Sequence, residues 1–190
     1  MAPEDPIGSV PAAPLPTASF AGSPTLLLTV GGLIIGDSAS PLPELEARRT
    51  ALLEAAYAAL DTALRRDARD IHWMGLEEQR RAARRAPTLN LEPDRLNSVY
   101  LVGRKVQAMV DPLWAEVRTL AGLTGARMVV APAAAKLSGR MGAYVASYVL
   151  VVADTRVGQV VWRSRATGSP AGTPEAAFAS AASAAVVPLH

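Results

Sequence analysis

The chain has 190 residues, a formal net charge of +2 and a hydrophobic fraction of 50%, but only 5% of its residues are aromatic. This length predicts one main domain, large enough to bury roughly 70% of the surface that its unfolded chain exposes. Cysteine is absent, which excludes a disulfide framework and a thiolate metal site, and we expect no lipid-anchored lipoprotein.

The first 24 residues contain six prolines and few large side chains. Such a composition buries too little apolar surface to offset the entropy of ordering the segment. No residue from Pro6 to Gly36 is charged, which favours contact with protein or lipid headgroups over water. We therefore expect residues 1–24 to form an extended arm that binds a partner through Pro11, Pro14, Pro16 and Phe20. Removal of the arm should leave a folded α/β domain of residues 25–190.

The first half of this domain alternates between strand-like and helical patterns. Residues 25–35 form a short apolar run between turn residues and predict a buried, central strand. After Pro41 and Pro43, leucine and alanine recur at helical spacing, which predicts a long amphipathic helix over one face of the sheet. Residues 71–74 predict a second strand, and an arginine-rich segment predicts a helix that ends at Pro87.

The second half predicts a helix from Asp111 to Gly122, strands over residues 127–131, 142–153 and 159–166, and an alanine-rich helix over 174–186. Residues 154–158 end in glycine and predict the turn of an antiparallel hairpin between the last two strands. The order of elements predicts an α+β fold of mixed α/β layers. In it, helices pack on a central mixed sheet that has a C-terminal antiparallel hairpin.

A group of arginines is the strongest local signal: Arg80, Arg81, Arg84 and Arg85, preceded by Arg65, Arg66 and Arg69. The spacing predicts that the four later guanidinium groups lie on one broad side of a helix, where they could bind carboxylates or phosphates bidentately. Glu77 lies three residues before Arg80 and four before Arg81, and Glu78 lies three before Arg81. This spacing predicts a solvated face with internal ion pairs. We favour that interpretation over a nucleic-acid site, because the net charge is small and stacking aromatics are few. An acidic partner protein or anionic lipid headgroups are intermediate possibilities.

Residues that could carry catalysis or bind a metal are scarce. The only histidines are His72 and His190, too few for a histidine metal site, and we interpret His72 as a structural residue rather than a general base. Gly31 and Gly32 lie within the predicted strand and Gly36 directly follows it, which indicates a bulge or a close backbone approach, not a phosphate loop. We expect no enzymatic activity, no cofactor and no bound metal.

Three tryptophans are the largest side chains, and core packing is the favoured interpretation for each. Trp114 follows Pro112 near the start of a predicted helix. It is the tryptophan that we expect at a rim, where a partner could contact it.

Three segments carry a resemblance to known proteins: EEQRRAARRAPTLNLEPDRL, DPLWAEVRTLAGLTGARMVVAPA and YVLVVADTRVGQVVWRSRATG. Together with the layout over about residues 25–186, they resemble TolB N-terminal-like or CsgG-like α/β domains, in particular those of uncharacterised gemmatimonad proteins. The combination of such an α/β domain with an extended arm that binds a partner also resembles membrane-extrinsic S-type subunits of the gemmatimonad photosynthetic reaction centre and light-harvesting complex. That resemblance implies reaction-centre and light-harvesting polypeptides as partners.

We therefore expect a non-enzymatic structural accessory subunit that docks on a larger membrane complex and has no transmembrane segment of its own. It would be membrane-associated and extrinsic. The cytoplasmic face is favoured because Glu4 and Asp5 lie where a secretory signal needs positive charge, and the periplasmic face is the alternative. Two other functions stay open: an envelope module that binds a ligand or peptide, and a nucleic-acid binder that uses the arginine-rich helix. Of these possibilities, we favour a protein that has no nucleic-acid partner.

Overall fold

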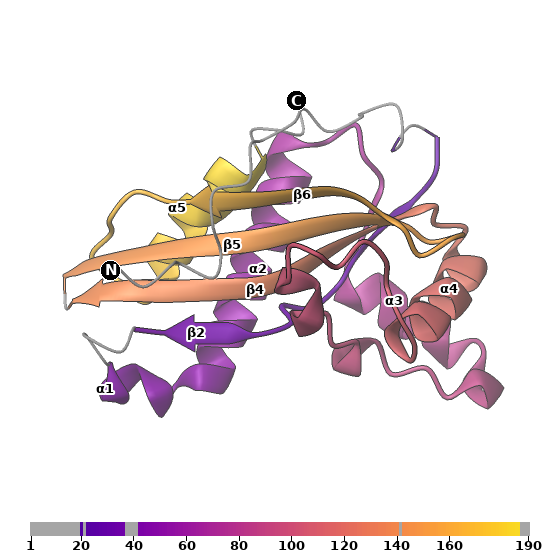
Figure 1. The fold of residues 1–190 in the computed structure, drawn as a ribbon, viewed down its shortest axis with the longest axis horizontal. Coiled ribbons are helices and arrows are strands. Elements are labelled where there is room, and N and C mark those ends of the chain that lie inside the picture. Colours follow the sequence, from indigo (N-terminus) through magenta and orange to yellow (C-terminus); the bar gives the residue numbers. More distant parts are fainter. Residues whose placement is uncertain (1–19, 21, 37–41, 141, 187–190) are drawn as a thin grey trace.

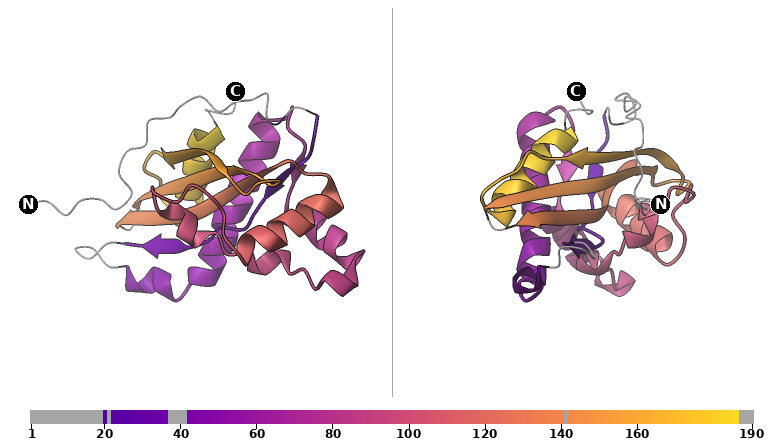
Figure 2. Two further views of the ribbon diagram at one scale, coloured as in Figure 1. Left: turned by 45° about the vertical axis from the view of Figure 1, so that its right-hand side comes forward. Right: turned by 60° about the vertical axis from the view of Figure 1, so that its left-hand side comes forward.

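A computed structural model describes residues 20, 22–36, 42–140 and 142–186. Helices lie on both faces of one mixed sheet (Figures 1 and 2), which confirms the predicted α+β class. The strands are β1 (Thr25–Leu27), β2 (Leu33–Ile35), β3 (Trp73–Met74), β4 (Met128–Arg140), β5 (Ala143–Asp154) and β6 (Val160–Thr167). The α-helices are α1 (Pro43–Glu46), α2 (Arg49–Asp67), α3 (Leu76–Arg84), α4 (Leu113–Thr124) and α5 (Pro174–Val186). Short 3₁₀ helices are η2 (Pro87–Leu89), η3 (Pro93–Arg95) and η4 (Val99–Val102).

The sheet has the strand order β3-β1-β4-β5-β6, and β2 pairs with β4 beyond the end of β1. The N-terminal strands β1 and β2 pair in parallel with β4, and β3 pairs in parallel with β1. Strands β4, β5 and β6 form an antiparallel meander. The predicted hairpin is therefore confirmed as β5 and β6, and Gly158 in its turn has a φ of 72°.

The single strand predicted over residues 25–35 is in fact two strands. β1 is central and buried, as expected. Between β1 and β2 the chain keeps single backbone hydrogen bonds to β4 but no regular strand pairing, and Ile34 of β2 is 44% exposed. A Cβ on Gly31 would lie 2.6 Å from the backbone nitrogen of Val99 and 2.7 Å from the carbonyl oxygen of Ala133. The close backbone approach that the glycines indicated is therefore present at Gly31, which lies between the two strands.

Strand β4 is much longer than the predicted strand over 127–131. It continues through Pro132 to Arg140, and its register with β5 shifts between Pro132 and Ala134. A proline cannot donate to the ladder and normally marks the end of a central strand. Here the irregularity at Pro132 accommodates the missing N–H, so the strand resumes on the other side.

One core lies between the sheet and the helix pair α2 and α5 (Figure 2). The predicted apolar face of α2 is buried, including Leu52 and Leu60, and α5 contributes Phe178. Tyr148 of β5 lies 6.2 Å from Phe178 between ring centroids and donates its hydroxyl to the carbonyl oxygen of Ala56 at 2.8 Å. This hydrogen bond ties the middle of α2 to the sheet.

A second core lies on the opposite face, beneath α4 and the segment around η4. Its fully buried members include Leu26 of β1, Leu101 of η4, Leu120 of α4 and Val129 of β4. The two cores share the sheet as a common wall, because successive residues of a strand point to opposite faces.

Two residues of the predicted arm, Phe20 and Pro24, contact the domain. Phe20 is 3% exposed and lies 6.4 Å from Trp73 between ring centroids. The carbonyl oxygen of Pro24 accepts a hydrogen bond from the backbone N–H of Arg127 at 3.2 Å. The interpretation of Phe20 as a partner contact on a free arm is therefore wrong for this structure, because its ring is buried in the chain's own core. Residues Pro11, Pro14 and Pro16 lie outside the described residues.

Candidate functional site

Helix α3 presents the four arginines because its inward face is occupied by two other residues, Gln79 and Ala83. The Gln79 side chain is fully buried, and its Nε2 donates to the carbonyl oxygens of Leu27 and Met74, each at 2.7 Å. It thus joins the ends of two neighbouring strands, β1 and β3. Residues four apart share one helix face, so the pair Gln79 and Ala83 fixes the rotation of α3 and turns the arginines outward.

The arginines are divided between two flanks of α3. Arg80 and Arg84 line a first hollow of about 660 Å³ on one flank. Arg81 and Arg85 line a second hollow of about 320 Å³ on the other. The expectation that all four arginines share one broad side of the helix is corrected here. Arg80 and Arg84 share one face because they are four residues apart, and Arg81 and Arg85 share the adjacent face for the same reason.

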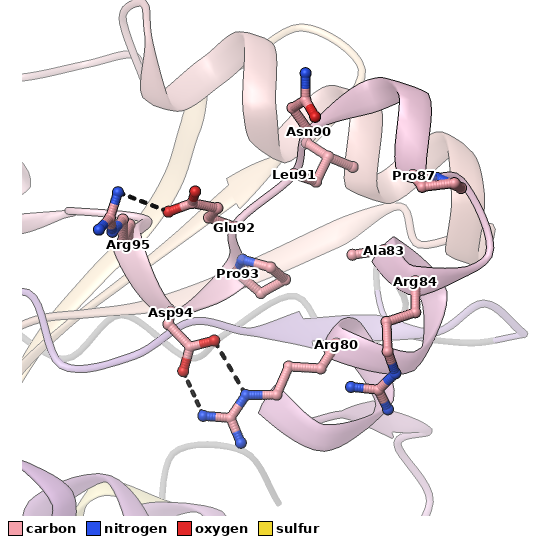
Figure 3. A pocket seen from close by; sticks show the side chains of 10 residues that line it. All are labelled: Arg80, Ala83, Arg84, Pro87, Asn90, Leu91, Glu92, Pro93, Asp94 and Arg95. Carbon is pink, nitrogen blue, oxygen red and sulfur yellow. Dashed lines mark hydrogen bonds and ion pairs between the residues drawn. The ribbon is translucent and has the colours of Figure 1, made fainter.

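The first hollow lies between α3 and the segment that carries η2 and η3 (Figure 3). Arg80 forms ion pairs with Glu77 and Asp94, and its hydrogen bonds to Asp94 lower the pKa of that carboxyl. Arg95 on the opposite rim pairs with Glu92 at 2.8 Å. Arg84 also lines the hollow, and none of the carboxylates in the described ranges forms an ion pair with it. One guanidinium group of this hollow is thus left for an external anion.

The second hollow lies beside the β3 end of the sheet. It is lined by Pro24, His72, Met74, Glu78, Arg81, Ala82, Arg85, Leu123 and Thr124. Arg81 approaches Glu78 at 3.8 Å, a loose contact, whereas Arg85 forms no ion pair with any carboxylate that the structure describes. The internal ion pairs predicted from Glu77 and Glu78 are therefore present, but they neutralise only the first two arginines.

Trp114 packs against other parts of the same chain. The guanidinium carbon of Arg118 lies 4.9 Å from the centroid of the indole ring, and a Cβ on Gly158 would lie 2.9 Å from the ring. The indole is thus held between its own helix and the β5–β6 turn. Its buried Nε1 has no hydrogen-bond partner among the described residues.

The hollows include residues that the sequence did not single out. Asn90, Leu91 and Pro93 line the first hollow, and Leu123 and Thr124 line the second. The exposure of Leu123, 40%, is the one local sign, and it is visible only after α4 is placed. Sequence patterns alone gave no indication of these residues. Leu123 and Thr124 come from α4, far along the chain, and Asn90, Leu91 and Pro93 face α3 only because the segment after it folds back.

Within the described ranges, no group of three or more His, Asp or Glu side chains could hold a metal ion. A search of the same ranges found no helix that is long and apolar enough to cross a membrane. His72 is exposed and lines the second hollow.

No protein-family model matches the sequence, and no curated protein is significantly similar to it. Among solved structures, the chain is similar to the PelC dodecamer from Paraburkholderia phytofirmans, with 13% identity, a TM-score of 0.46, and coverage of 96% of this chain and 93% of that one. It is also similar to the LpoB C-terminal domain from Salmonella enterica, with 15% identity, a TM-score of 0.38, and coverage of 78% and 84%. For lipoprotein GNA1162 from Neisseria meningitidis, the identity is 12%, the TM-score is 0.34, and the coverage is 76% and 79%. Similarity this distant assigns the chain to none of these families.

Proposed function

We propose that this protein is a non-enzymatic accessory subunit that docks, through the arginines of α3, on an acidic surface of a partner in a membrane-associated complex. The observation that carries the proposal is the last turn of α3, where Arg84 and Arg85 line two different hollows and form no ion pair with the described carboxylates. Two uncompensated guanidinium groups on a rigid helix form a preorganised site for carboxylates.

The identity of the neighbouring residues favours a protein partner over nucleic acid. Nucleic-acid sites combine a broad positive field with aromatic side chains on which bases stack. Glu77, Glu78 and Asp94 lie among the arginines of α3 and limit that field. Trp73 is buried, and Trp114 is packed between Arg118 and Gly158, so neither supports stacking of bases at α3.

For the particular complex, we propose a photosynthetic reaction centre with its light-harvesting polypeptides, as the sequence resemblance to gemmatimonad proteins implies. In this proposal the protein is extrinsic to the membrane, on the cytoplasmic face, and residues 1–19 with Pro11, Pro14 and Pro16 extend to a neighbouring subunit. Anionic lipid headgroups near α3 would add to the attraction. Trp114 is not part of the proposed surface.

The test is co-purification of the tagged full-length chain from its native membranes in mild detergent. The double variant Arg84→Glu/Arg85→Glu should lose the partner proteins, and high salt should weaken the wild-type association. Arg48→Glu is the matched control: Arg48 is also exposed, and among the described residues its ion pair is with Glu175. It precedes α2, a helix of 19 residues and therefore about 28 Å long, and it lies at the end remote from α3.

Equal recovery of partners with the double variant and the wild type would refute docking through α3. Recovery of photosynthetic polypeptides would support the particular complex that we propose. Recovery of a different set of membrane proteins, lost in the double variant, would retain the docking role and reject the photosynthetic assignment.

A further inference from the structure

The earlier arginines, Arg65 and Arg69, lie next to the later ones in space. They line a third hollow of about 450 Å³ at the C-terminal end of α2, together with Asp70, Ile71, His72 and Trp73. His72 also lines the second hollow beside α3. The second and third hollows therefore adjoin at His72, and the two groups of arginines that are separate in the sequence flank one composite surface.

Positive charge exceeds negative charge on this composite surface. Arg65, Arg69, Arg81 and Arg85 line the two hollows together with two carboxylates, Glu78 and Asp70, and Asp61 beside them is a third. Glu78 is engaged by Arg65 at 3.2 Å and by Arg81 at 3.8 Å, and Arg65 is also paired with Asp61 at 3.0 Å. Arg69 donates to the carbonyl oxygen of Arg66 at 2.7 Å but, like Arg85, forms no ion pair with a described carboxylate.

The composite surface is partly apolar. Met74 and Ala82 are half-buried in the second hollow, the Leu123 side chain is exposed there, and Ile71 is half-buried in the third. Leu123 and Met74 line the same hollow as Arg85, and covering their exposed apolar surface with an apolar side chain is favourable. The composite surface thus matches a ligand that carries negative charges on either side of an apolar group.

We propose that the composite surface around His72 binds a short acidic peptide segment of the partner, in which an apolar side chain lies between two carboxylates. The apolar side chain contacts Leu123 and Met74, and the flanking carboxylates pair with Arg69 and Arg85. This inference rests on the proposed docking function and deepens it, because it names the chemistry of the docked segment. A lipid headgroup fits less well, since it offers no apolar group that would reach into a recess between charged residues.

The experiment measures binding of three fluorescently labelled peptides to the full chain by anisotropy at low salt. The peptides are Asp-Leu-Asp-Leu-Asp, its neutral analogue Asn-Leu-Asn-Leu-Asn, and the acidic but apolar-free Asp-Gly-Asp-Gly-Asp. We expect the first to bind about tenfold more tightly than either of the others. Equal binding of all three peptides would overturn the proposal.

Two variants locate the site. Arg69→Gln/Arg85→Gln should weaken binding of the first peptide by about tenfold, and Leu123→Ser should weaken it by about threefold. Arg48→Gln, a matched neutralisation at the far end of α2, should leave it unchanged. Circular dichroism of each variant checks that it is folded. In a separate NMR measurement, an imidazole signal of His72 that does not shift when the peptide is added would show that the peptide binds elsewhere.

Tighter binding to phosphatidylglycerol vesicles or to a single-stranded oligonucleotide than to the acidic peptide would also overturn the proposal. The two hypotheses fail separately. If Arg84→Glu/Arg85→Glu abolishes co-purification but Arg69→Gln and Leu123→Ser do not weaken it, docking through α3 stands and the acidic peptide site around His72 is rejected.

Discussion

The phenolic oxygen of Tyr57 accepts the backbone N–H of Leu76 at 2.7 Å. Tyr57 belongs to the middle of α2 and Leu76 is the first residue of α3, so one hydrogen bond fixes the start of the arginine-bearing helix to the long helix beside it. Gly75 lies directly beneath this contact, since a Cβ there would be 3.2 Å from the Tyr57 hydroxyl and 2.6 Å from a guanidinium nitrogen of Arg65. The position of α3 therefore depends on contacts that are remote in sequence.

Replacement of Tyr57 by Phe should lower the free energy of unfolding by about 1–2 kcal/mol, because the buried N–H of Leu76 loses its acceptor. Urea unfolding followed by circular dichroism measures this change. Tyr144→Phe is the control: Tyr144 is buried, whereas Tyr57 is half-buried, and the structure gives no hydrogen bond from the Tyr144 hydroxyl to a described residue. A similar loss in both variants would show that the Tyr57 hydrogen bond is not the cause.

Ionisation of the Tyr57 phenol should lower the stability of the protein at alkaline pH. Burial raises the pKa of Tyr57 to about 12, against about 10 in an unfolded chain, and burial also raises the pKa of Tyr148. A group whose folded pKa is raised contributes its full stability below pH 10 and loses it as the pH rises through 12. The free energy of unfolding should therefore fall between about pH 10 and pH 12, and less steeply in Tyr57→Phe. Parallel profiles for wild type and variant would contradict the assignment.

Glycine substitutions should separate a tight backbone contact from an open helix position. Gly31→Ala should destabilise the domain by about 2–4 kcal/mol, because the new Cβ would overlap with backbone atoms of Val99 and Ala133. Gly122→Ala should stabilise it by about 0.5–1 kcal/mol, because Gly122 lies within α4 with nothing within 4 Å of its added Cβ. Thermal melts of the two variants measure both effects, and equal melting temperatures would refute the close approach at Gly31.

Truncation of the N-terminus should have an effect that depends on whether Phe20 is kept. Removal of residues 1–19 should leave the melting temperature nearly unchanged, whereas removal of residues 1–24 should lower stability by about 3 kcal/mol or more. The physical reason is the contact between Phe20 and Trp73 in the core. Phe20→Ala in the full chain is the matched test, and it should reproduce most of the loss. If the protein that lacks residues 1–24 unfolds like the wild type, Phe20 does not stabilise the domain and the predicted arm of residues 1–24 is supported.

Much of the secondary structure could be predicted from local patterns. The helical spacing of Leu52 and Leu60 predicted α2, and the glycine at 158 predicted the hairpin turn, because helix period and positive φ are properties of short segments. The continuation of β4 through Pro132 could not be predicted, since a proline is tolerated there only because β4 and β5 shift register at that point. The burial of Phe20 could not be predicted either. Its local sequence is typical of a proline-rich tail, and its partner Trp73 lies far along the chain.

Composition and local spacing are enough to establish that arginines dominate one helix, that Glu77 and Glu78 neutralise part of them, and that histidine and cysteine are too scarce for common catalytic sites. The surroundings of those arginines depend on the packing of α3 against the sheet. The buried amide of Gln79 bridges the strands β1 and β3. This fixes the rotation of α3, and with it the hollow that each of Arg84 and Arg85 lines. The fold also brings Arg69 beside His72 and close to the hollow of Arg85. Side chains on separate helices become neighbours only through packing on a shared sheet, which no local spacing encodes.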